Sequence, residues 1–170
     1  GSIKNGNVLF DNTMLSGEPC ILTNIILGST ICNSIIYLDW FGGIVNDVNA
    51  DCANAFENVG KIKADNMPEI KLKPGAYYSS SFKCPPFATI SGTGRSQTSI
   101  KAKSSGLSYE YSGSQTNNLF IAVNQPRTKI LDLTIDGGEL EGYDNVGIGS
   151  YKTGYLLTIE RCKFINCSKG

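Results

Sequence analysis

Apolar residues come in short runs along most of the chain, separated by Asn, Gly, Ser and Pro. Residues 3–38 follow this pattern throughout, and it is typical of brief strands joined by turns. Within 69–82 and 87–102, a Pro-Gly pair and a glycine-rich stretch each separate two strand-like runs, which predicts strand, turn and strand in both. Residues 103–118 are rich in Ser, Gly and Asn and predict a long exposed loop. The pattern as a whole indicates an all-β protein.

One stretch carries a helical period instead. Its apolar positions, spaced i, i+3, i+4 and i+7, are Cys52, Ala55, Phe56 and Val59. This spacing places them on one face of a helix. Asp51 is a suitable N-cap and Gly60 a suitable C-terminal stop. The sequence therefore predicts a single short helix near residues 51–60, with one narrow buried stripe.

The last third of the chain contains an internal repeat. Its apolar positions are Ile130, Leu133 and Ile135 in the first copy and Ile159, Cys162 and Phe164 in the second, each 29 residues from its counterpart. A spacing of three and then two residues predicts that a strand bends once, at Asp132 or Arg161, and then resumes simple alternation. Units of this kind cannot bury their apolar faces alone, which favours a solenoid built from strands. Two unrelated strands of a β-sandwich are the alternative.

Charge and cysteine content narrow the possible partners. Lys plus Arg and Asp plus Glu both total 15, so the formal net charge is zero, and we expect no nucleic-acid partner. No apolar run reaches the roughly 18 residues of a spanning helix, so we expect no membrane insertion. The chain has no histidine and no C-x-x-C pair among its six cysteines, so we expect no metal and no cofactor. Cysteines at apolar positions favour reduced core thiols over a disulfide framework.

Several motifs occur in an order that resembles a known family. The residues that carry the resemblance are Trp40, Phe41, Gly42, Asp47, Asp51, Pro74, Gly75, Tyr77, Gly92, Gly94, Ser99 and Ile100. Together they resemble the start of a pectin-lyase-like right-handed β-helix, as in bacteriophage tailspikes and polysaccharide depolymerases. The resemblance implies a right-handed parallel β-helix with a short helix that caps the end of the solenoid. Asp132 and Arg161 replace the turn asparagine expected in such rungs, which puts a stacked asparagine ladder in doubt.

The resemblance also implies an organisation and a function. We expect an N-terminal β-strand segment at 1–38 and the start of the β-helix at 39–170, truncated at its C-terminal end. The implied protein is a phage tailspike-like homotrimer of the virion that binds and depolymerises a bacterial surface polysaccharide during host recognition. One alternative is a non-catalytic structural, trimerisation or attachment module of a virion protein. Another is a bacterial secreted polysaccharide lyase or adhesin, which would be extracellular.

An acidic stretch at 132–144 is the candidate site for chemistry. Glycoside hydrolysis uses two carboxylates roughly 5–10 Å apart, and the candidates for this role are Asp136, Glu139 and Glu141. The candidates for substrate binding are Tyr143, Asp144 and Tyr151, because a tyrosine ring can cover the apolar face of a sugar. Asp136 follows an inward isoleucine and is expected to point outward.

Two alternatives to this site stay open. An acidic glycine-rich loop is often simply solvated, and tyrosines are also common in strands for structural reasons. The resemblance places the catalytic groove of either a hydrolase or a lyase several rungs further along, beyond this chain. Trp40, beside an apolar run and two glycines, is expected to be a packing anchor.

Overall fold

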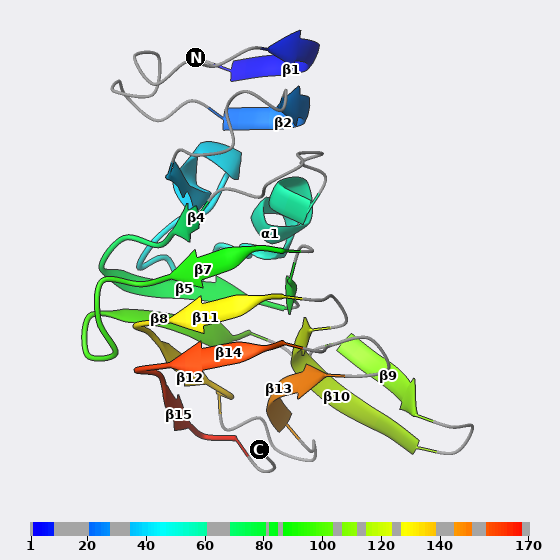
Figure 1. The fold of residues 1–170 in the computed structure, drawn as a ribbon, viewed down its shortest axis with the longest axis vertical. Coiled ribbons are helices and arrows are strands. Elements are labelled where there is room, and N and C mark those ends of the chain that lie inside the picture. The colour runs from blue at the N-terminus through cyan, green and yellow to red at the C-terminus, as the bar shows by residue number, and fades with distance from the viewer. Residues whose placement is uncertain are drawn as a thin grey trace.

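Parallel strands dominate the computed structural model of the chain (Figure 1). The structure describes residues 2–8, 21–27, 35–60, 69–80, 82–84, 87–103, 107–111, 115–123, 127–138, 145–150 and 156–167. Two strands, β1 (Ser2–Val8) and β2 (Ile21–Leu27), form a separate parallel sheet. The remaining described strands form three further sheets. The predicted all-β class is confirmed, and the division at residue 38 stays a prediction.

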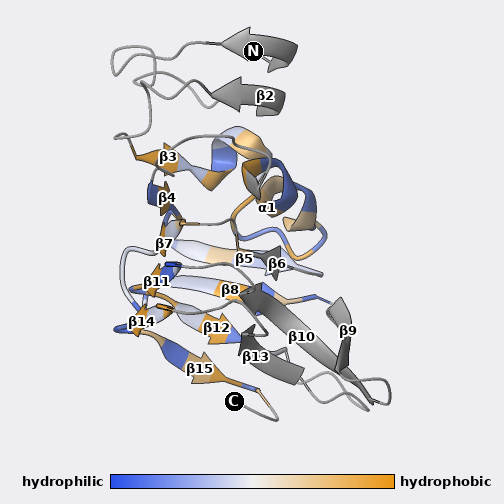
Figure 2. Ribbon diagram, turned by 45° about the vertical axis from the view of Figure 1, so that its right-hand side comes forward, coloured by the Kyte–Doolittle hydropathy of each residue, from blue (hydrophilic) through white to orange (hydrophobic). Residues whose placement is uncertain are grey.

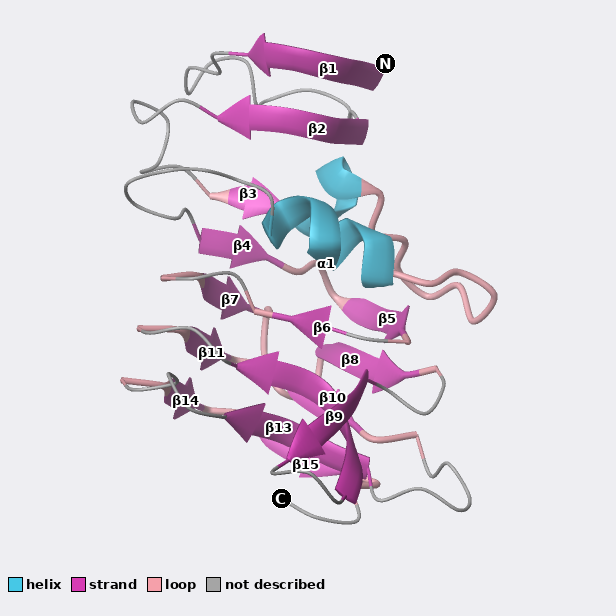
Figure 3. Cartoon of the chain, turned by 90° about the vertical axis from the view of Figure 1, so that its right-hand side faces the viewer, coloured by secondary structure: helices cyan, strands magenta, loops and turns pink. Residues whose placement is uncertain are grey.

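From β4 onward the chain adds strands to three sheets in a repeating order, with one extra strand in the third sheet. The first sheet contains β3 (Ile36–Tyr37), β4 (Glu69–Lys71), β7 (Thr89–Ser91), β11 (Lys129–Leu131) and β14 (Thr158–Glu160). The second contains β5 (Gly75–Ser79), β8 (Thr98–Ala102), β12 (Thr134–Asp136) and β15 (Lys163–Ile165). The third contains β6 (Phe82–Lys83), β10 (Gln115–Val123) and β13 (Asn145–Ser150), together with β9 (Leu107–Tyr111), which pairs with β10. Figure 3 shows the strands of the first sheet one above another along the stack.

Apolar side chains stack in register inside these sheets. In the first sheet the aligned positions are Ile36, Ile70, Ile90, Ile130 and Ile159. In the second sheet they are Tyr77, Ile100, Ile135 and Phe164. Orange in Figure 2 marks the apolar positions on β11, β12 and β14. All are buried except the members on the last strands, Ile159 at 40% and Phe164 at 42% exposure.

The 29-residue repeat corresponds to neighbouring strands of the stack. Ile130 pairs with Ile159, and Ile135 pairs with Phe164. Both predicted bend residues adopt the left-handed conformation, with φ of 56° at Asp132 and 52° at Arg161. A left-handed residue turns the chain sharply between the first and second sheets, which is why the apolar spacing changes from three to two there. The predicted repeat and its bends are confirmed.

The prediction of a loop at 103–118 is wrong in part. Within it, β9 (Leu107–Tyr111) pairs in antiparallel fashion with β10, which begins at Gln115. The tyrosines at alternate positions of β9 favour a strand, and residues 112–114, Ser-Gly-Ser, have the composition of a turn. The prediction failed because the Ser and Gly content was given more weight than the alternation.

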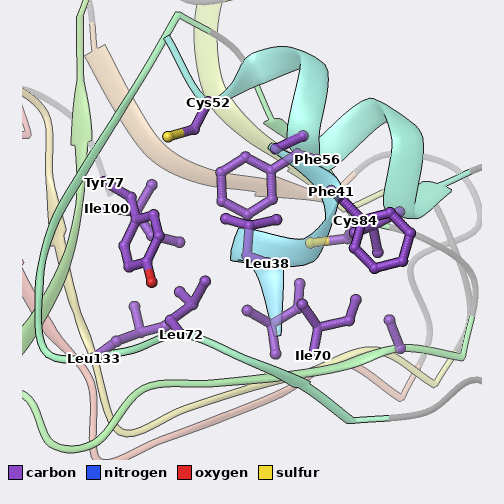
Figure 4. Packing of buried hydrophobic residues seen from close by; sticks show 14 of the residues in the cluster. Leu38, Phe41, Cys52, Phe56, Ile70, Leu72, Tyr77, Cys84, Ile100 and Leu133 are labelled. Carbon is purple, nitrogen blue, oxygen red and sulfur yellow. The ribbon is translucent and has the colours of Figure 1, made fainter. Parts of the chain in front are cut away.

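The predicted helix is present as α1 (Ala53–Gly60), preceded by a short 3-10 helix, η2 (Leu38–Phe41). Asp51 caps α1, because its Oδ1 accepts a hydrogen bond from the Ala53 N–H at 2.9 Å. The predicted stripe on α1 is buried. Figure 4 shows Phe56 of α1 next to Leu38 of η2, within the cluster of buried residues. Trp40 is also buried, edge-on to Tyr37 at 5.3 Å between ring centres, which confirms its role as a packing anchor.

The segment before α1 covers the outer edge of β5, which is the edge strand of the second sheet nearest the N-terminus. We call residues 46–52 the edge loop. Asn46 N–H donates to the Ala76 carbonyl at 2.8 Å, and Asn46 Oδ1 accepts from the Ala76 N–H at 2.9 Å. Cys52 N–H donates to the Tyr78 carbonyl at 2.8 Å, and Asp51 Oδ1 accepts from the Ser80 N–H at 3.0 Å. The edge loop thus satisfies backbone groups that an open sheet edge would expose.

The edge loop lies so close to β5 that one position requires glycine. Gly75 has φ of 124°, and a Cβ there would collide with Val45 and Asn46. Lys103 holds the loop from its other side, because its ammonium donates to the carbonyls of Asn49 at 2.5 Å and Ala50 at 2.9 Å. The loop and helix are therefore fixed by contacts that converge from several strands.

The four cysteines with described side chains are free thiols, as predicted. Cys52 and Cys84 are buried in the core, whereas Cys162 and Cys167 are half-buried. Burial raises the pKa of both core thiols, so they behave as small apolar groups at neutral pH.

Candidate functional site

The structure describes one of the six predicted site residues. Asp136 lies at the end of β12. The other five, Glu139, Glu141, Tyr143, Asp144 and Tyr151, lie outside the residues whose side chains the structure describes. Whether these five approach Asp136 stays a prediction.

Asp136 is buried, at 7% exposure, and not on the solvent-facing surface as expected. Its Oδ2 lies 3.3 Å from the Lys101 ammonium. Its Oδ1 accepts hydrogen bonds from the Asn166 side-chain amide at 2.8 Å and from the Gly138 N–H at 3.0 Å. The expectation of an outward, solvated carboxylate is therefore wrong, because neighbouring strands supply side chains that enclose it.

The strand register of the second sheet explains why Asp136, Lys101 and Asn166 lie together. Asp136 pairs with Lys101 of β8 on one side, and Asn166 follows β15 on the other side. Asn166 has φ of 54°, a left-handed conformation that asparagine tolerates better than most residues. Both carboxylate oxygens of Asp136 are thus occupied by donors from the adjacent rungs. The contacts are those of a structural carboxylate that joins three successive strands of the second sheet.

Asp132, the other described member of the acidic stretch, is also occupied. Arg161 binds it through two parallel contacts, Nε to Oδ1 at 2.5 Å and Nη2 to Oδ2 at 2.8 Å. The Arg161 guanidinium therefore holds the pKa of Asp132 below its usual range. This ion pair lies at the two positions whose residues put a stacked asparagine ladder in doubt. The described part of the stretch thus contains two carboxylates, and each is bound by a cation from a neighbouring rung.

A third polar group, which the sequence analysis did not predict, lies at the N-terminal end of the stack. The Tyr77 hydroxyl donates to Asp39 Oδ2 at 3.2 Å and accepts from the Lys73 N–H at 2.9 Å. Asp39 Oδ1 also lies 3.3 Å from the Lys73 ammonium. Burial, and then the Asp39 charge, raise the pKa of Tyr77, so its hydroxyl stays protonated. Tyr77 is fully buried, which supports a structural role over stacking on a sugar.

A fourth feature is a row of exposed residues at the corner that leads into the first sheet. We call Phe87, Arg127 and Leu156 the corner row. Each lies three residues before a core isoleucine, respectively Ile90, Ile130 and Ile159. All three have left-handed φ angles, of 58°, 55° and 62°. The constant offset from the isoleucines is a sequence signal that could have identified this row.

Three further observations limit the kinds of site. Among the residues that the structure describes, no three His, Cys, Asp or Glu side chains form a group suited to a metal ion. In the described part of the chain, no helix is long and apolar enough to cross a membrane. No protein-family model, curated protein or solved structure matches the chain.

Proposed function

We propose that the three parallel sheets are the coils of a right-handed β-helix of the pectin-lyase-like kind. The observation that supports this proposal is the recurring order of strands. From β4 onward the chain visits the first, second and third sheets in turn, with β9 as an extra strand beside β10, and one isoleucine per coil lies in register along the first sheet. A solenoid of this kind stabilises itself through contacts between successive coils. In it, the edge loop and α1 are the cap near the N-terminal end.

We further propose that this β-helix belongs to a tailspike-like homotrimer of a phage virion that binds a bacterial surface polysaccharide. A long, regular stack presents side chains at a constant spacing of about 4.8 Å. Such a surface suits a polymer with a repeating unit, because each coil can offer the same kind of contact to successive sugars.

The second candidate is a non-catalytic attachment or trimerisation module, and the contacts of Asp132 and Asp136 favour it. Glycoside hydrolysis needs a carboxylic acid that donates a proton and a second carboxylate that acts as base or nucleophile. Both described carboxylates of the acidic stretch are engaged by Arg161 and Lys101 instead. We therefore assign binding to this part of the protein and leave depolymerisation, by hydrolysis or by lyase chemistry, to residues not described in the structure.

The test is the molar mass of the purified chain by light scattering, followed by retention on immobilised polysaccharides from bacterial surfaces. A trimer that is retained supports the proposal, whereas a monomer that binds no polysaccharide contradicts it.

Asp136→Asn then separates the two candidates. If Asp136 is a catalytic residue, the variant keeps its melting temperature and loses any release of reducing ends. If Asp136 is structural, the melting temperature falls because the Lys101 ammonium loses its charged partner. Lys101→Met, which removes the partner charge, is the matched comparison.

A further inference from the structure

Asp136 contacts an amine and a carboxamide at the same time. The Lys101 ammonium lies 3.3 Å from its Oδ2, and the Asn166 Nδ2 donates to its Oδ1 at 2.8 Å. Lys101 belongs to the coil before Asp136, and Asn166 belongs to the coil after it. An amine that has lost its proton is a nucleophile, and the Cγ of a carboxamide is an electrophile. The three side chains together therefore contain the groups needed to form a new amide bond.

Close packing of the backbone fixes Asn166 beside Asp136. A Cβ at Gly137 would collide with the Asn166 carbonyl oxygen, so glycine is required at this crossing. The Gly137 N–H also donates to the Ile165 carbonyl at 2.9 Å. The Gly138 N–H donates to Asp136 Oδ1 at 3.0 Å. The carboxylate and the carboxamide are therefore held in a fixed arrangement, and such positioning favours a reaction between neighbouring groups.

Solvent access differs between the three side chains. The Asp136 side chain is 9% exposed, the Lys101 side chain is 38% exposed, and Asn166 is an exposed residue. Asp136 is thus shielded from water, which strengthens its interaction with a nearby amine. A leaving group released at Asn166, by contrast, has a route to solvent. Lys101 has a flexible stem, so its Nζ can move from Asp136 toward the Asn166 Cγ.

We propose that Lys101 and Asn166 form an isopeptide bond, which is an amide between their side chains, with Asp136 as the base. Asp136 removes one proton from the Lys101 ammonium. The neutral Nζ attacks the Asn166 Cγ, and a new Nζ–Cγ bond forms as the Cγ–Nδ2 bond breaks. Nδ2 receives the second proton that Nζ loses and leaves as ammonia. The ammonia takes the proton held by Asp136, so ammonium departs and Asp136 is ionised again.

This bond joins β8 to the residue after β15, across β12, which lies between them. The two outer strands are about 10 Å apart, because neighbouring strands are spaced by about 4.8 Å. Among the described strands, β15 pairs on one side only, with β12. A covalent link therefore holds an edge strand in place, and it also restricts the unfolded chain between residues 101 and 166. The inference does not depend on polysaccharide binding.

The experiment measures the intact mass of the purified full chain by mass spectrometry after several days at neutral pH. An isopeptide bond lowers the mass by that of one ammonia molecule. Trypsin does not cleave after a lysine whose amine is part of an amide, so residues 96–103 and 164–169 stay joined in one branched peptide. The test variants are Lys101→Arg, Asn166→Gly and Asp136→Asn. The matched control is Lys163→Arg, which replaces an exposed lysine of β15.

The expected result is the lower mass and the branched peptide for the wild type and for Lys163→Arg. Each of the three test variants has the mass of its sequence and yields no branched peptide. Lys101→Arg keeps a cation beside Asp136, and Asn166→Gly accepts the left-handed φ of 54°, so both variants should fold. Circular dichroism checks this, and if Asp136→Asn is unfolded, the other two variants decide.

Each other outcome overturns the inference. A wild type that keeps the mass of its sequence has formed no isopeptide bond. A mass lower by one ammonia molecule with separate peptides indicates a cyclic imide at an asparagine. A mass lower by one water molecule, with residues 96–103 joined to the peptide that contains Asp136, indicates attack on the carboxylate instead. A lower mass that persists in Lys101→Arg points to another nucleophile.

Discussion

Asp51→Ala removes a side-chain oxygen that joins the edge loop both to α1 and to Ser80, the residue that follows β5. Asp51 Oδ1 accepts from the Ala53 N–H in the first turn of the helix and from the Ser80 N–H beyond the end of β5. Alanine leaves both donors without this acceptor. The helix loses its cap, and the sheet edge loses one of the contacts that cover it.

Loss of an N-cap carboxylate costs about 1 kcal/mol, and loss of the second hydrogen bond costs about 1 kcal/mol more at a site that water can reach. We therefore expect Asp51→Ala to lower the free energy of unfolding by about 2 kcal/mol. The assay is urea unfolding followed by the fluorescence of Trp40, the single tryptophan of the chain, which is buried in η2 close to α1 in sequence. Asp51→Asn is the matched control, because its amide oxygen can still accept both hydrogen bonds.

The pH dependence provides a second check. Desolvation alone would raise the pKa of Asp51, but hydrogen bonds from Ser80 and Ala53 and the Lys103 charge outweigh it, so the pKa is lowered. A lowered pKa means that the stabilisation is complete above the unfolded value of 3.8 and is lost as the pH falls through the folded value. The wild type and Asp51→Ala should therefore differ at pH 7 and converge as the pH falls through the lowered pKa of Asp51 in the folded state. Equal stability of the two proteins at pH 7 would refute the role of Asp51.

Three other substitutions test the stack and its corners. Ile130→Ala should cost about 2–5 kcal/mol in urea unfolding, whereas Ile159→Ala, in the same row but 40% exposed, should cost about 1–2 kcal/mol; equal costs would contradict the in-register core. Arg161→Gln should lower the melting temperature at low salt only, because salt screens its exposed pair with Asp132; an equal loss in 1 M salt would point to packing instead. Phe87→Gly should raise the free energy of unfolding by up to about 1 kcal/mol, since glycine accepts a left-handed φ; a large loss of stability would show that the Phe87 side chain supports the fold.

The repeat could be predicted from sequence because register in a stacked sheet fixes the apolar positions. Ile130 and Ile159 must align if both are to enter the same core, so their separation equals the number of residues from one strand of the first sheet to the next. The change of spacing at Asp132 likewise reports the turn between β11 and β12. The short helix was predictable for a similar reason, since one buried face and one cap residue define it locally.

The remaining features depend on residues that are distant in sequence. Asn46 and Ala76 are 30 residues apart, and no local pattern in either indicates that they share two hydrogen bonds. Asp136 was expected to be solvated because its own strand alternates, but Lys101 and Asn166, from the coils before and after, enclose it. Alternation along one strand predicts the direction of a side chain and says nothing about what neighbouring strands place beside it.

The two corners of the first sheet show how the same backbone problem has two different solutions. At the corner leading out of the sheet, left-handed Asp132 and Arg161 bind each other, so the charge of each side chain is used within the fold. At the corner leading into it, left-handed Phe87 and Arg127 also lie at corresponding positions before neighbouring strands, but they form no such pair with each other. A fold that needed only a turn could place glycine or asparagine at both corners at lower cost. The contacts within the fold therefore account for the charged side chains at the first corner, whereas the side chains at the second corner add strain without a compensating ion pair among the described residues.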